Sequence, residues 1–335
     1  MQPVGWGMVG IGGIAATVGP VFATTAGARL VGVAARDPQR TAAFAARHGA
    51  VRSYETFEAL LSDPEIEAVY LGTPNWLHAE QAIQALVAGK HVLVEKPMAI
   101  SVADAERMVS AARAAERILG VGFHLRYQSV IRELRRRMRD DGFGAVILAQ
   151  AQWGMDMPSV SGWKIDPARA GAGSVMGLGV HLIDLLRWLI GREIVAVTAC
   201  ADGPAASYPV EFLTLGLLEF DGGAFGQITC SRRLPHSANS VTVYSPQARL
   251  TGARVVSMRP EGALIVSRGA ADEFIAVPSE NPYANEIEAF SRAVRERVPF
   301  AASGEDGLQV VRVTSALLEA SAQGRRVLVD GGARA

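Results

Sequence analysis

The stretch VGWGMVGIGGIAA, residues 4–16, decides the fold that we expect for this chain. Its first part, 4–10, predicts a buried strand that runs into glycines, and a helix follows that is interrupted near Gly19-Pro20. In this strand–turn–helix context, Gly10-x-Gly12-x-x-Ala15 is typical of a turn that binds a dinucleotide, although a glycine-rich turn without a ligand has the same pattern. Gly10 permits the tight turn, and Gly12 lets backbone N–H groups approach a pyrophosphate. The expected cofactor contacts here are Gly10, Gly12, Gly13 and Ile14.

The rest of the first third alternates short apolar runs with helical segments. Pro38 and Gly49 mark the two ends of one helix, and Ser101 is the expected N-cap of another. Strands that alternate with helices of this length predict a parallel, doubly wound Rossmann sheet. The expected strands are 30–35, 66–73, 91–96 and 118–123, and the expected helices are 38–49, 77–89 and 101–116.

From about residue 143 the strands become longer, and DGG at 221–223 predicts a hairpin turn. The sequence therefore predicts an α/β protein: a Rossmann domain at 1–123 and an α+β domain at 124–335 with a large, mostly antiparallel sheet. The expected strands are 146–153, 193–200, 212–220, 224–231, two regions near 241–250 and 263–277, and 325–330; helices are expected near 284–297 and 305–323.

Composition excludes several classes of protein. Lys plus Arg and Asp plus Glu number 33 each among 335 residues, so a basic nucleic-acid footprint is absent. The first 28 residues carry no charge, but no basic region precedes the apolar stretch within them and glycines interrupt that stretch, which disfavours a signal peptide. No uninterrupted membrane span is expected. The two cysteines, Cys200 and Cys230, form no CxxC pair, so we expect core thiols, no metal site and a cytoplasmic location.

The end of the second strand bears on the choice of dinucleotide. An NAD site favours Asp or Glu there, whereas this chain has Ala34-Ala35-Arg36-Asp37. A small residue followed by arginine suits a 2′-phosphate, because guanidinium binds phosphate in a bidentate manner. Asp37 has two readings, a ribose contact or the cap of the next helix. We expect NADP(H) to be preferred through Arg36, with NAD(H) as the alternative.

The strand at 91–96 ends in Glu95-Lys96-Pro97, at the sheet edge where open α/β proteins bind ligands. A lysine there can hold a substrate hydroxyl and share its proton, although a surface lysine at a strand end is the plainer interpretation. Pro97 is a candidate for a cis peptide bond. The expected cofactor contacts at this edge are Thr73, Asn75, His78, Glu95 and Lys96, with His78 either structural or against the cofactor.

A second group of candidate residues lies beyond the Rossmann strands. His124 and Arg126 follow the last of these strands and are expected to face the cleft. In GAGSVMGLGVHLID (171–184), His181 and Asp184 share one helix face. A histidine suits proton exchange with an alcohol or ketone. One turn before it, where a carboxylate would orient the imidazole, stands Gly177.

Four motifs coincide: GIGGIA near the start, TPNWLH at 73–78, EKP at 95–97 and GAG…GVHLID at 171–184. Together they resemble the Gfo/Idh/MocA oxidoreductases over nearly the whole chain. HLR at 124–126 and GWK at 162–164 look most like the 1,5-anhydrofructose reductase branch and its sugar- or diol-dehydrogenase neighbours.

The resemblance implies an NAD(P)-dependent enzyme that moves a hydride between nicotinamide and a carbon of a sugar, anhydro-sugar, cyclitol or related polyol. It implies that Lys96 polarises the reacting oxygen and that His181 is the acid/base. It also implies a second domain that binds substrate and pairs subunits into a homodimer or homotetramer. The implied substrate contacts are Lys96, Arg126, Trp163, Lys164, His181 and Asp184.

The chain departs from the family pattern GGG-x-x-x-D-x-x-x-H at two positions, Ala172 and Gly177. Gly177 removes the acid that commonly partners the lysine and histidine. Either Asp184 or Asp166 compensates, or the glycine enlarges the pocket for another substrate. Two hypotheses follow: an active NADP(H)-dependent oxidoreductase, or a weakly catalytic or non-catalytic dinucleotide-binding paralogue that acts as a sensor or assembly partner.

Overall fold

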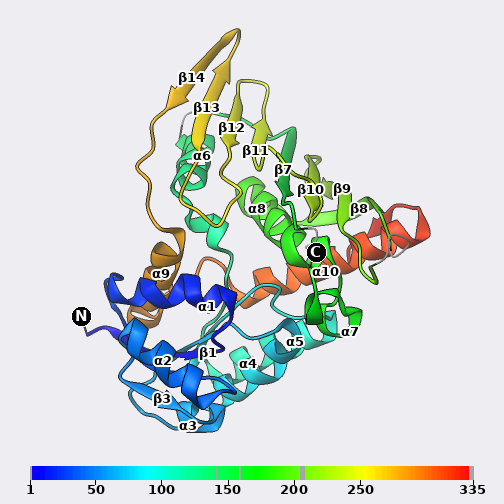
Figure 1. Ribbon diagram of the computed structural model, residues 1–335. Helices are drawn as coiled ribbons and strands as arrows, with labels where there is room; N and C mark the ends of the chain where they lie inside the picture. The colour runs from blue at the N-terminus through cyan, green and yellow to red at the C-terminus, as the bar shows by residue number, and fades with distance from the viewer. Residues whose placement is uncertain (1, 141, 158–159, 204–207, 332–335) are drawn as a thin grey trace. The chain divides into compact units, whose positions relative to one another are not determined.

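The computed structural model describes residues 2–140, 142–157, 160–203 and 208–331 (Figure 1). The chain divides into two compact units. The first comprises Met1–Gly122 and Tyr283–Leu308, and the second comprises Phe123–Pro282 and Gln309–Ala335. Residues 1 and 332–335, at the outer ends of the two expected domains, lie outside the described residues.

The first unit is built on a parallel sheet with the strand order β3-β2-β1-β4-β5-β6 in the described chain. The expected Rossmann sheet is thus confirmed, and its order reverses between β1 and β4, where such sheets bind ligands. The edge strand β3 was not predicted, because its three residues contain no apolar run. The strands are β1 (Val4–Val9), β2 (Ala28–Ala34), β3 (Arg52–Tyr54), β4 (Ala68–Leu71), β5 (His91–Val94) and β6 (Leu119–Val121).

Two helices of this unit begin at the residues that the sequence indicates, whereas the short helix α3 was not predicted. Asp37 and Ser101 cap α2 and α5 by accepting hydrogen bonds from backbone N–H groups. Gly49 ends α2 in the left-handed region, with φ at 70°. The helical elements are α1 (Gly13–Val18), η1 (Gly19–Ala23), α2 (Pro38–His48), α3 (Phe57–Leu61), η2 (Asn75–Leu77), α4 (His78–Val87) and α5 (Val102–Ala115).

One domain boundary differs from the expected one. Residues 283–308, which include most of α9 (Pro282–Glu296), belong to the first unit and not to a continuous domain at 124–335. The ring of Trp6 on β1 lies 5.2 Å from that of Phe290, and its Nε1 donates to Ser291 Oγ at 3.0 Å. Burial of these apolar rings holds the late segment against the first sheet, and sequence order does not reveal such a return.

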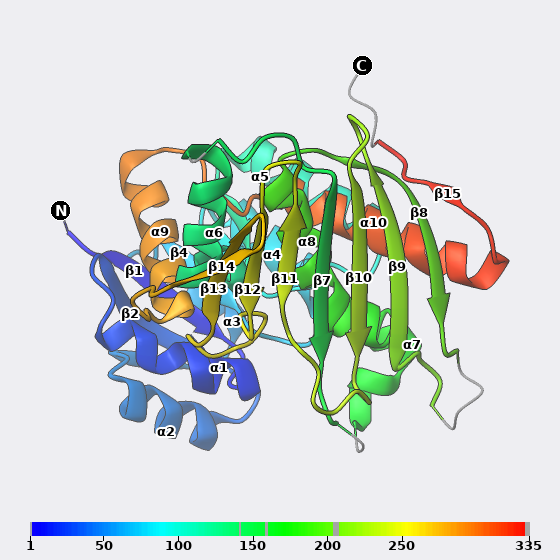
Figure 2. The same cartoon turned by 90° about the horizontal axis from the view of Figure 1, so that it is seen from above.

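The second unit contains a large sheet with the order β14-β13-β12-β11-β7-β10-β9-β8-β15 (Figure 2). Neighbouring strands in this sheet are antiparallel, except that β7 and β10 run parallel to each other. The predicted mostly antiparallel sheet is therefore confirmed. Its strands are β7 (Leu148–Gly154), β8 (Ile194–Ala201), β9 (Leu213–Phe220), β10 (Phe225–Ser231), β11 (Val241–Tyr244), β12 (Arg249–Ala253), β13 (Ala263–Arg268), β14 (Ala271–Ile275) and β15 (Val327–Leu328).

Helices cover one face of this sheet. A Cβ at Gly179 would lie 3.1 Å from Cys230 Sγ on β10, and one at Gly216 on β9 would lie 2.9 Å from Leu317. Figure 2 shows α8 and α10 behind the strands. The helical elements are η3 (His124–Tyr127), α6 (Ser129–Asp140), η4 (Gly162–Ile165), α7 (Pro167–Ala170), η5 (Val175–Gly179, a π-helical turn), α8 (Val180–Ile190) and α10 (Gly304–Gln323), whose first residues belong to the first unit.

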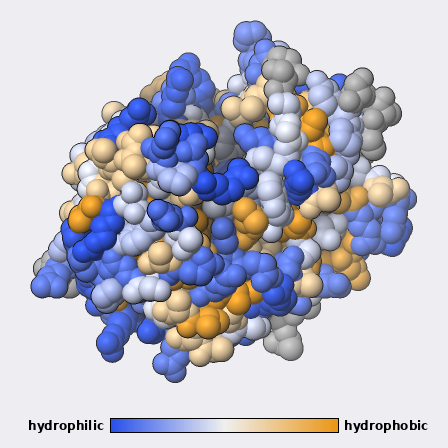
Figure 3. Space-filling view, turned by 60° about the horizontal axis from the view of Figure 1, so that its bottom comes forward, coloured by the Kyte–Doolittle hydropathy of each residue, from blue (hydrophilic) through white to orange (hydrophobic). Residues whose placement is uncertain are grey.

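Apolar side chains also reach the surface of the second unit. Leu215 and Leu217 on β9 are 44% and 58% exposed, and Phe225 on β10 is 55% exposed. Figure 3 shows a face of the molecule on which hydrophilic and hydrophobic residues are interspersed. The exposed leucines alternate along β9 with buried residues, so they occupy the sheet face opposite Leu317.

One segment is long and apolar enough to cross a membrane by length and composition. It covers Pro167–Ile190, with a mean hydropathy of 1.3 in its most apolar window. In the structure 83% of that window is buried. Side chains packed inside the protein cannot face lipid, so we interpret this segment as a core helix.

Candidate active site

The first glycine turn has the geometry that a dinucleotide requires. Gly10 has φ at 89°, and a Cβ there would lie 2.8 Å from the Gly72 carbonyl oxygen. Side chains are therefore excluded at this position. At Gly12 and Gly13 a Cβ would meet no atom within 4 Å. The outer side of the turn is bare backbone, and half-buried Ile14 follows it, so the residues present fit the approach of a pyrophosphate.

The end of β2 shows which role Asp37 has in the protein itself. Its Oδ1 accepts a hydrogen bond from the backbone N–H of Arg40 at 3.0 Å, which caps α2. Arg36 is exposed, and no ion pair within the described ranges involves it. The guanidinium at this position is thus available to a ligand, while the neighbouring carboxylate serves the helix.

His78 joins the two loops that follow β4 and β5. The buried imidazole lies between two carbonyl oxygens, with Nε2 2.8 Å from Thr73 O and Nδ1 2.8 Å from Pro97 O. Burial lowers the pKa of His78, and the charge of Lys96 acts in the same direction. This geometry supports the structural interpretation of His78. Asn75 is half-buried at the start of η2, between the Thr73 carbonyl and His78 in sequence. Thr73 Oγ1 donates a hydrogen bond to Gln81 Oε1 at 2.6 Å.

The Glu95-Lys96-Pro97 motif stands at the carboxyl end of β5, and its Lys96–Pro97 bond is cis. Glu95 is buried, and it accepts a hydrogen bond from Tyr70 OH at 2.5 Å and one from the Lys96 backbone N–H at 3.2 Å. Burial raises the pKa of the Glu95 carboxyl, and the nearby Lys96 charge opposes this only in part. Glu95 therefore holds the backbone of the lysine, whose side chain is half-buried.

In the second unit His181 is held among aromatic rings. It is 2% exposed at the start of α8, and its ring centroid lies 4.9 Å from that of Trp153 and 4.9 Å from that of His124. Phe123 approaches edge-on at 6.4 Å. This packing restricts the imidazole orientation, which is the task that an aspartate at position 177 would have.

Two residues expected to bind substrate are bound to each other. Arg126 on η3 and Asp184 on α8 form a buried, bidentate ion pair, with Nε–Oδ2 at 2.8 Å and Nη2–Oδ1 at 2.5 Å. Asp166 caps α7 through the Ala168 N–H at 3.0 Å. Both carboxylates proposed as substitutes for the missing acid thus have structural partners.

The expected contacts Trp163 and Lys164 lie on η4. Trp163 is half-buried and Lys164 is exposed, and the Lys164 carbonyl oxygen lies 3.4 Å from Arg232 Nη1. Arg232 directly follows β10, so η4 and the end of that strand are neighbours within the second unit.

Sequence reasoning missed Arg232 and Glu211. A Cβ added at Gly177 would overlap Arg232 Nη2, so the guanidinium occupies the space beside the glycine. Glu211 is buried and accepts hydrogen bonds from the N–H groups of Gly173 at 2.8 Å and Val175 at 2.9 Å. A charged residue at a strand end was the only signal for Arg232, and tertiary structure alone shows what it touches.

Comparison with known proteins identifies the family. An oxidoreductase family with an NAD-binding Rossmann fold matches residues 4–123, and the Gfo/Idh/MocA C-terminal domain matches residues 131–251. A 1,5-anhydro-D-fructose reductase of Ensifer adhaerens is 30% identical over 333 residues, which cover 98% of this chain and 99% of the relative. The chain belongs to the Gfo/Idh/MocA oxidoreductases.

Two further proteins are similar to this chain over most of their length. A D-xylose 1-dehydrogenase (NADP(+)) of Haloferax volcanii is 28% identical over 302 residues, which cover 89% of this chain and 91% of the relative. The crystal structure of an aldose-aldose oxidoreductase from Caulobacter crescentus, complexed with glycerol, has a TM-score of 0.92 and 28% identity, with 98% of this chain and 100% of that chain covered. The resemblance read from the sequence is confirmed, and this Gfo/Idh/MocA member is a nicotinamide-dependent oxidoreductase.

Proposed function

We propose that the chain transfers a hydride between NADP(H) and a hydroxyl or carbonyl carbon of a sugar, anhydro-sugar, cyclitol or related polyol. The relatives over nearly the whole chain are named as a reductase or dehydrogenase of such compounds. The observation that carries the proposal is the position of Lys96 at the carboxyl end of β5, in a sheet whose first turn presents bare backbone to a dinucleotide.

When bound, the nicotinamide accepts or gives the hydride. Lys96 donates a hydrogen bond to the reacting oxygen and stabilises negative charge as it develops there. His181 takes the hydroxyl proton when an alcohol becomes a carbonyl, and it returns a proton in the reverse direction. The ion pair between Arg126 and Asp184 holds η3 against α8, the helix that carries His181. In this proposal the two residues position the site and do not contact the substrate directly.

Replacement of Lys96 tests this function. Lys96→Ala should lower kcat/KM on polyol substrates at least a hundredfold and leave NADPH affinity within about twofold, because the lost group acts on the reacting oxygen. Arg113→Ala, which removes a 71% exposed cation of the same unit, is the control and should keep full activity. Undiminished turnover in the Lys96 variant would refute the proposed role. A panel of polyols, sugars and 1,5-anhydrofructose, followed at the reduced nicotinamide absorbance, identifies the substrate.

We further propose that NADP(H) is preferred over NAD(H) through the exposed guanidinium of Arg36. Arg36→Ala should weaken NADPH binding at least tenfold more than NADH binding, because only NADPH carries the 2′-phosphate. Arg47→Ala, in the last turn of α2, serves as the control. Titrations of protein fluorescence with both cofactors give the two ratios, and equal losses would remove Arg36 from the phosphate site.

Gly177 favours a second candidate, a weakly catalytic or non-catalytic paralogue. In that case Gly177→Asp should restore activity on neutral polyols, because it returns the acid beside His181. A loss of activity instead indicates a pocket adapted to the glycine. Initial rates of the variant and the parent protein on the same panel separate the two.

We also propose a cytoplasmic homodimer or homotetramer. Cys200 and Cys230 are both free thiols, which a reducing compartment preserves. Cys230 is buried, but Cys200 is exposed, so the expectation of two core thiols was wrong for Cys200. The exposed leucines of β9 and Phe225 of β10 offer an apolar surface to a second copy of the chain. The small-molecule substrate remains the only other partner in this proposal.

A further inference from the structure

The guanidinium of Arg232 is enclosed but only weakly bonded. Arg232 is 8% exposed. Within the described part of the protein, its side chain makes one hydrogen bond, from Nη1 to the Lys164 carbonyl oxygen at 3.4 Å. None of the ion pairs between described residues includes Arg232. A guanidinium has five N–H donors and does not lose its charge, so most of its bonding capacity is available.

The carboxylate of Glu211 does not use that capacity. Glu211 attracts Arg232 electrostatically, but its two oxygens accept the N–H groups of Gly173 and Val175 at the start of η5. Desolvation is the largest influence on Arg232 and lowers its pKa. Burial of a cation with few hydrogen bonds lowers the stability of a protein unless an anion binds to that cation.

Arg232 and His181 border the same side of the helical segment η5–α8. Gly177, which the guanidinium covers, precedes His181 by four residues, a spacing that places Cβ positions roughly 6 Å apart on a helix. Cys230 contacts Gly179 and pairs in register with Trp153, whose ring lies 4.9 Å from the imidazole. Arg232 is two residues beyond Cys230, so it leaves the strand end on the same face.

We propose that Arg232 binds a carboxylate of the substrate, so that the preferred substrates are sugar acids or other carboxylated polyols. This inference rests on the proposed function and narrows its substrate class. The planar guanidinium matches a carboxylate in a bidentate manner. The absence of a side chain at Gly177 also removes the acid that would repel such a group.

Matched pairs of substrates test the proposal. D-glucuronate and D-galacturonate are compared with D-glucose and D-galactose, and with the uncharged uronate methyl esters. In the parent protein kcat/KM should favour the acids at least tenfold. Arg232→Gln should lower the ratio of acid to neutral turnover at least thirtyfold, and Arg232→Lys should retain part of it.

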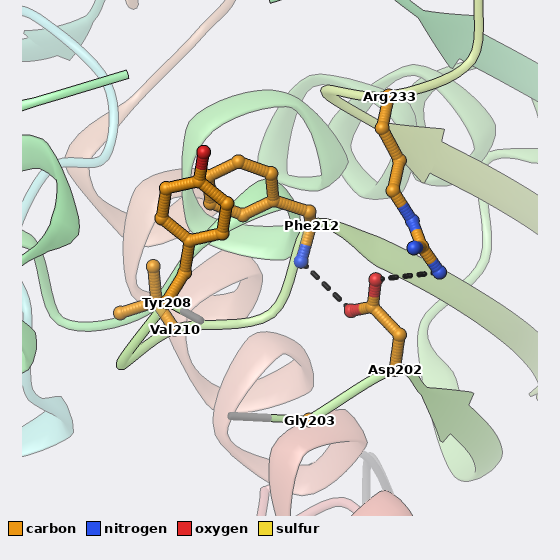
Figure 4. Close-up of a pocket in the computed structure, with 6 residues that line it drawn as sticks. All are labelled: Asp202, Gly203, Tyr208, Val210, Phe212 and Arg233. Atoms are coloured by element: carbon orange, nitrogen blue, oxygen red, sulfur yellow. Dashed lines mark hydrogen bonds and ion pairs between the residues drawn. The ribbon is translucent and has the colours of Figure 1, made fainter. Parts of the chain in front are cut away.

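The neighbouring arginine provides the control. Arg233 has a side chain that is 51% exposed, and its Nη2 lies 2.9 Å from Asp202 Oδ2. Figure 4 shows it directed at that carboxylate. Both residues line a pocket of about 50 Å³. Arg233→Gln removes the same charge one residue away, and it should change the acid-to-neutral ratio less than threefold. An equal effect of both substitutions, or a preference for neutral sugars in the parent protein, would overturn the inference.

A second variant and a binding measurement keep the test decisive. Gly177→Asp places a carboxylate on the guanidinium and should abolish the preference for acids even if Arg232→Gln fails to fold. Calorimetric titration of the NADPH-loaded protein with D-galacturonate and D-galactose measures affinity without turnover. Turnover of neutral polyols without Arg232-dependent uronate binding would refute the inference and keep the proposed function. Arg232-dependent uronate binding without hydride transfer would support the binding of a carboxylate at Arg232 and refute the proposed function.

Discussion

At the scale of single residues, two buried carboxylates of the second unit that look alike in the sequence have different structural partners. Asp184 is 1% exposed and has Arg126 as its bidentate partner, whereas Glu211 binds backbone N–H groups. Both acids thus serve structure, and the imidazole of His181 is oriented by rings. The chain therefore holds its expected acid/base without a carboxylate at position 177.

Removal of one member of the buried ion pair should be strongly destabilising. Asp184→Asn leaves the Arg126 charge enclosed without a counter-charge, and we expect the free energy of unfolding to fall by about 3–5 kcal/mol. Urea unfolding followed by circular dichroism measures the loss. Glu80→Gln breaks the exposed pair with Arg107 and should cost less than about 1 kcal/mol.

The double variant Arg126→Met with Asp184→Leu adds a further check. It removes both charges at once, so it should be less destabilised than Asp184→Asn. A double variant that is as unstable as the single one would mean that the polar contacts themselves, and not the unpaired charge, dominate at this position.

At the scale of elements, the start of α8 is organised by a strand residue. The π-helical turn η5 precedes α8, and its first N–H groups need acceptors because no earlier turn supplies them. Glu211, two residues before β9, accepts from Gly173 and Val175, while Ser174 Oγ donates to the Phe212 carbonyl. The segment that carries His181 is therefore anchored to the sheet at its first turn.

Loss of the cap that Glu211 provides should lower the free energy of unfolding. Glu211→Gln replaces one acceptor oxygen by an NH₂ group, so one backbone N–H loses its partner, and we expect a loss of about 1–3 kcal/mol in the free energy of unfolding. Glu219→Gln, at the exposed pair with Arg326, is the matched control and should cost less than about 1 kcal/mol. Comparable losses in both variants would contradict the capping role.

The same residue predicts a dependence on pH. Burial raises the pKa of Glu211 above its ordinary value of 4.5, so between that value and the folded-state pKa the folded protein binds more protons than the unfolded chain. The contribution of this carboxyl to stability is present below the window and falls as pH rises through it. In the parent protein the urea midpoint should fall as pH rises through this window. In Glu211→Gln, which cannot titrate there, the midpoint should fall less steeply with pH.

At the scale of the whole molecule, the second sheet leaves apolar residues in solvent. Leu215 and Leu217 face away from α10, and Phe225 extends the exposed apolar surface onto β10. Exposed apolar side chains on neighbouring strands of one sheet face are typical of a surface that pairs with another copy.

We expect the proposed oligomer to form through this face. Leu217→Glu, at a position that is 58% exposed, should shift the protein toward the mass of a single chain in light scattering after size exclusion, because a charge is costly to bury between subunits. Val87→Glu changes a 77% exposed valine on α4 of the first unit and should leave the mass unchanged. An unchanged mass in the Leu217 variant would place the contact elsewhere.

Local patterns were sufficient for most of the helices and strands of the first unit. The alternation of strands and helices, the caps Asp37 and Ser101, and the glycine turn at Gly10 depend on neighbours within a few residues, and the structure has them where the sequence indicates. The short strand β3 was missed because its residues form no apolar run.

By itself, the sequence determined the parallel Rossmann sheet, the mostly antiparallel second sheet and the family, since these depend on periodicity and on motifs at fixed spacing. Only the tertiary structure decided that 283–308 returns to the first unit, that Arg126 pairs with Asp184, and that Arg232 covers Gly177. Each of these depends on contacts between residues more than fifty positions apart. Burial and charge pairing across such separations are properties of the folded chain, and no local pattern encodes which partners meet.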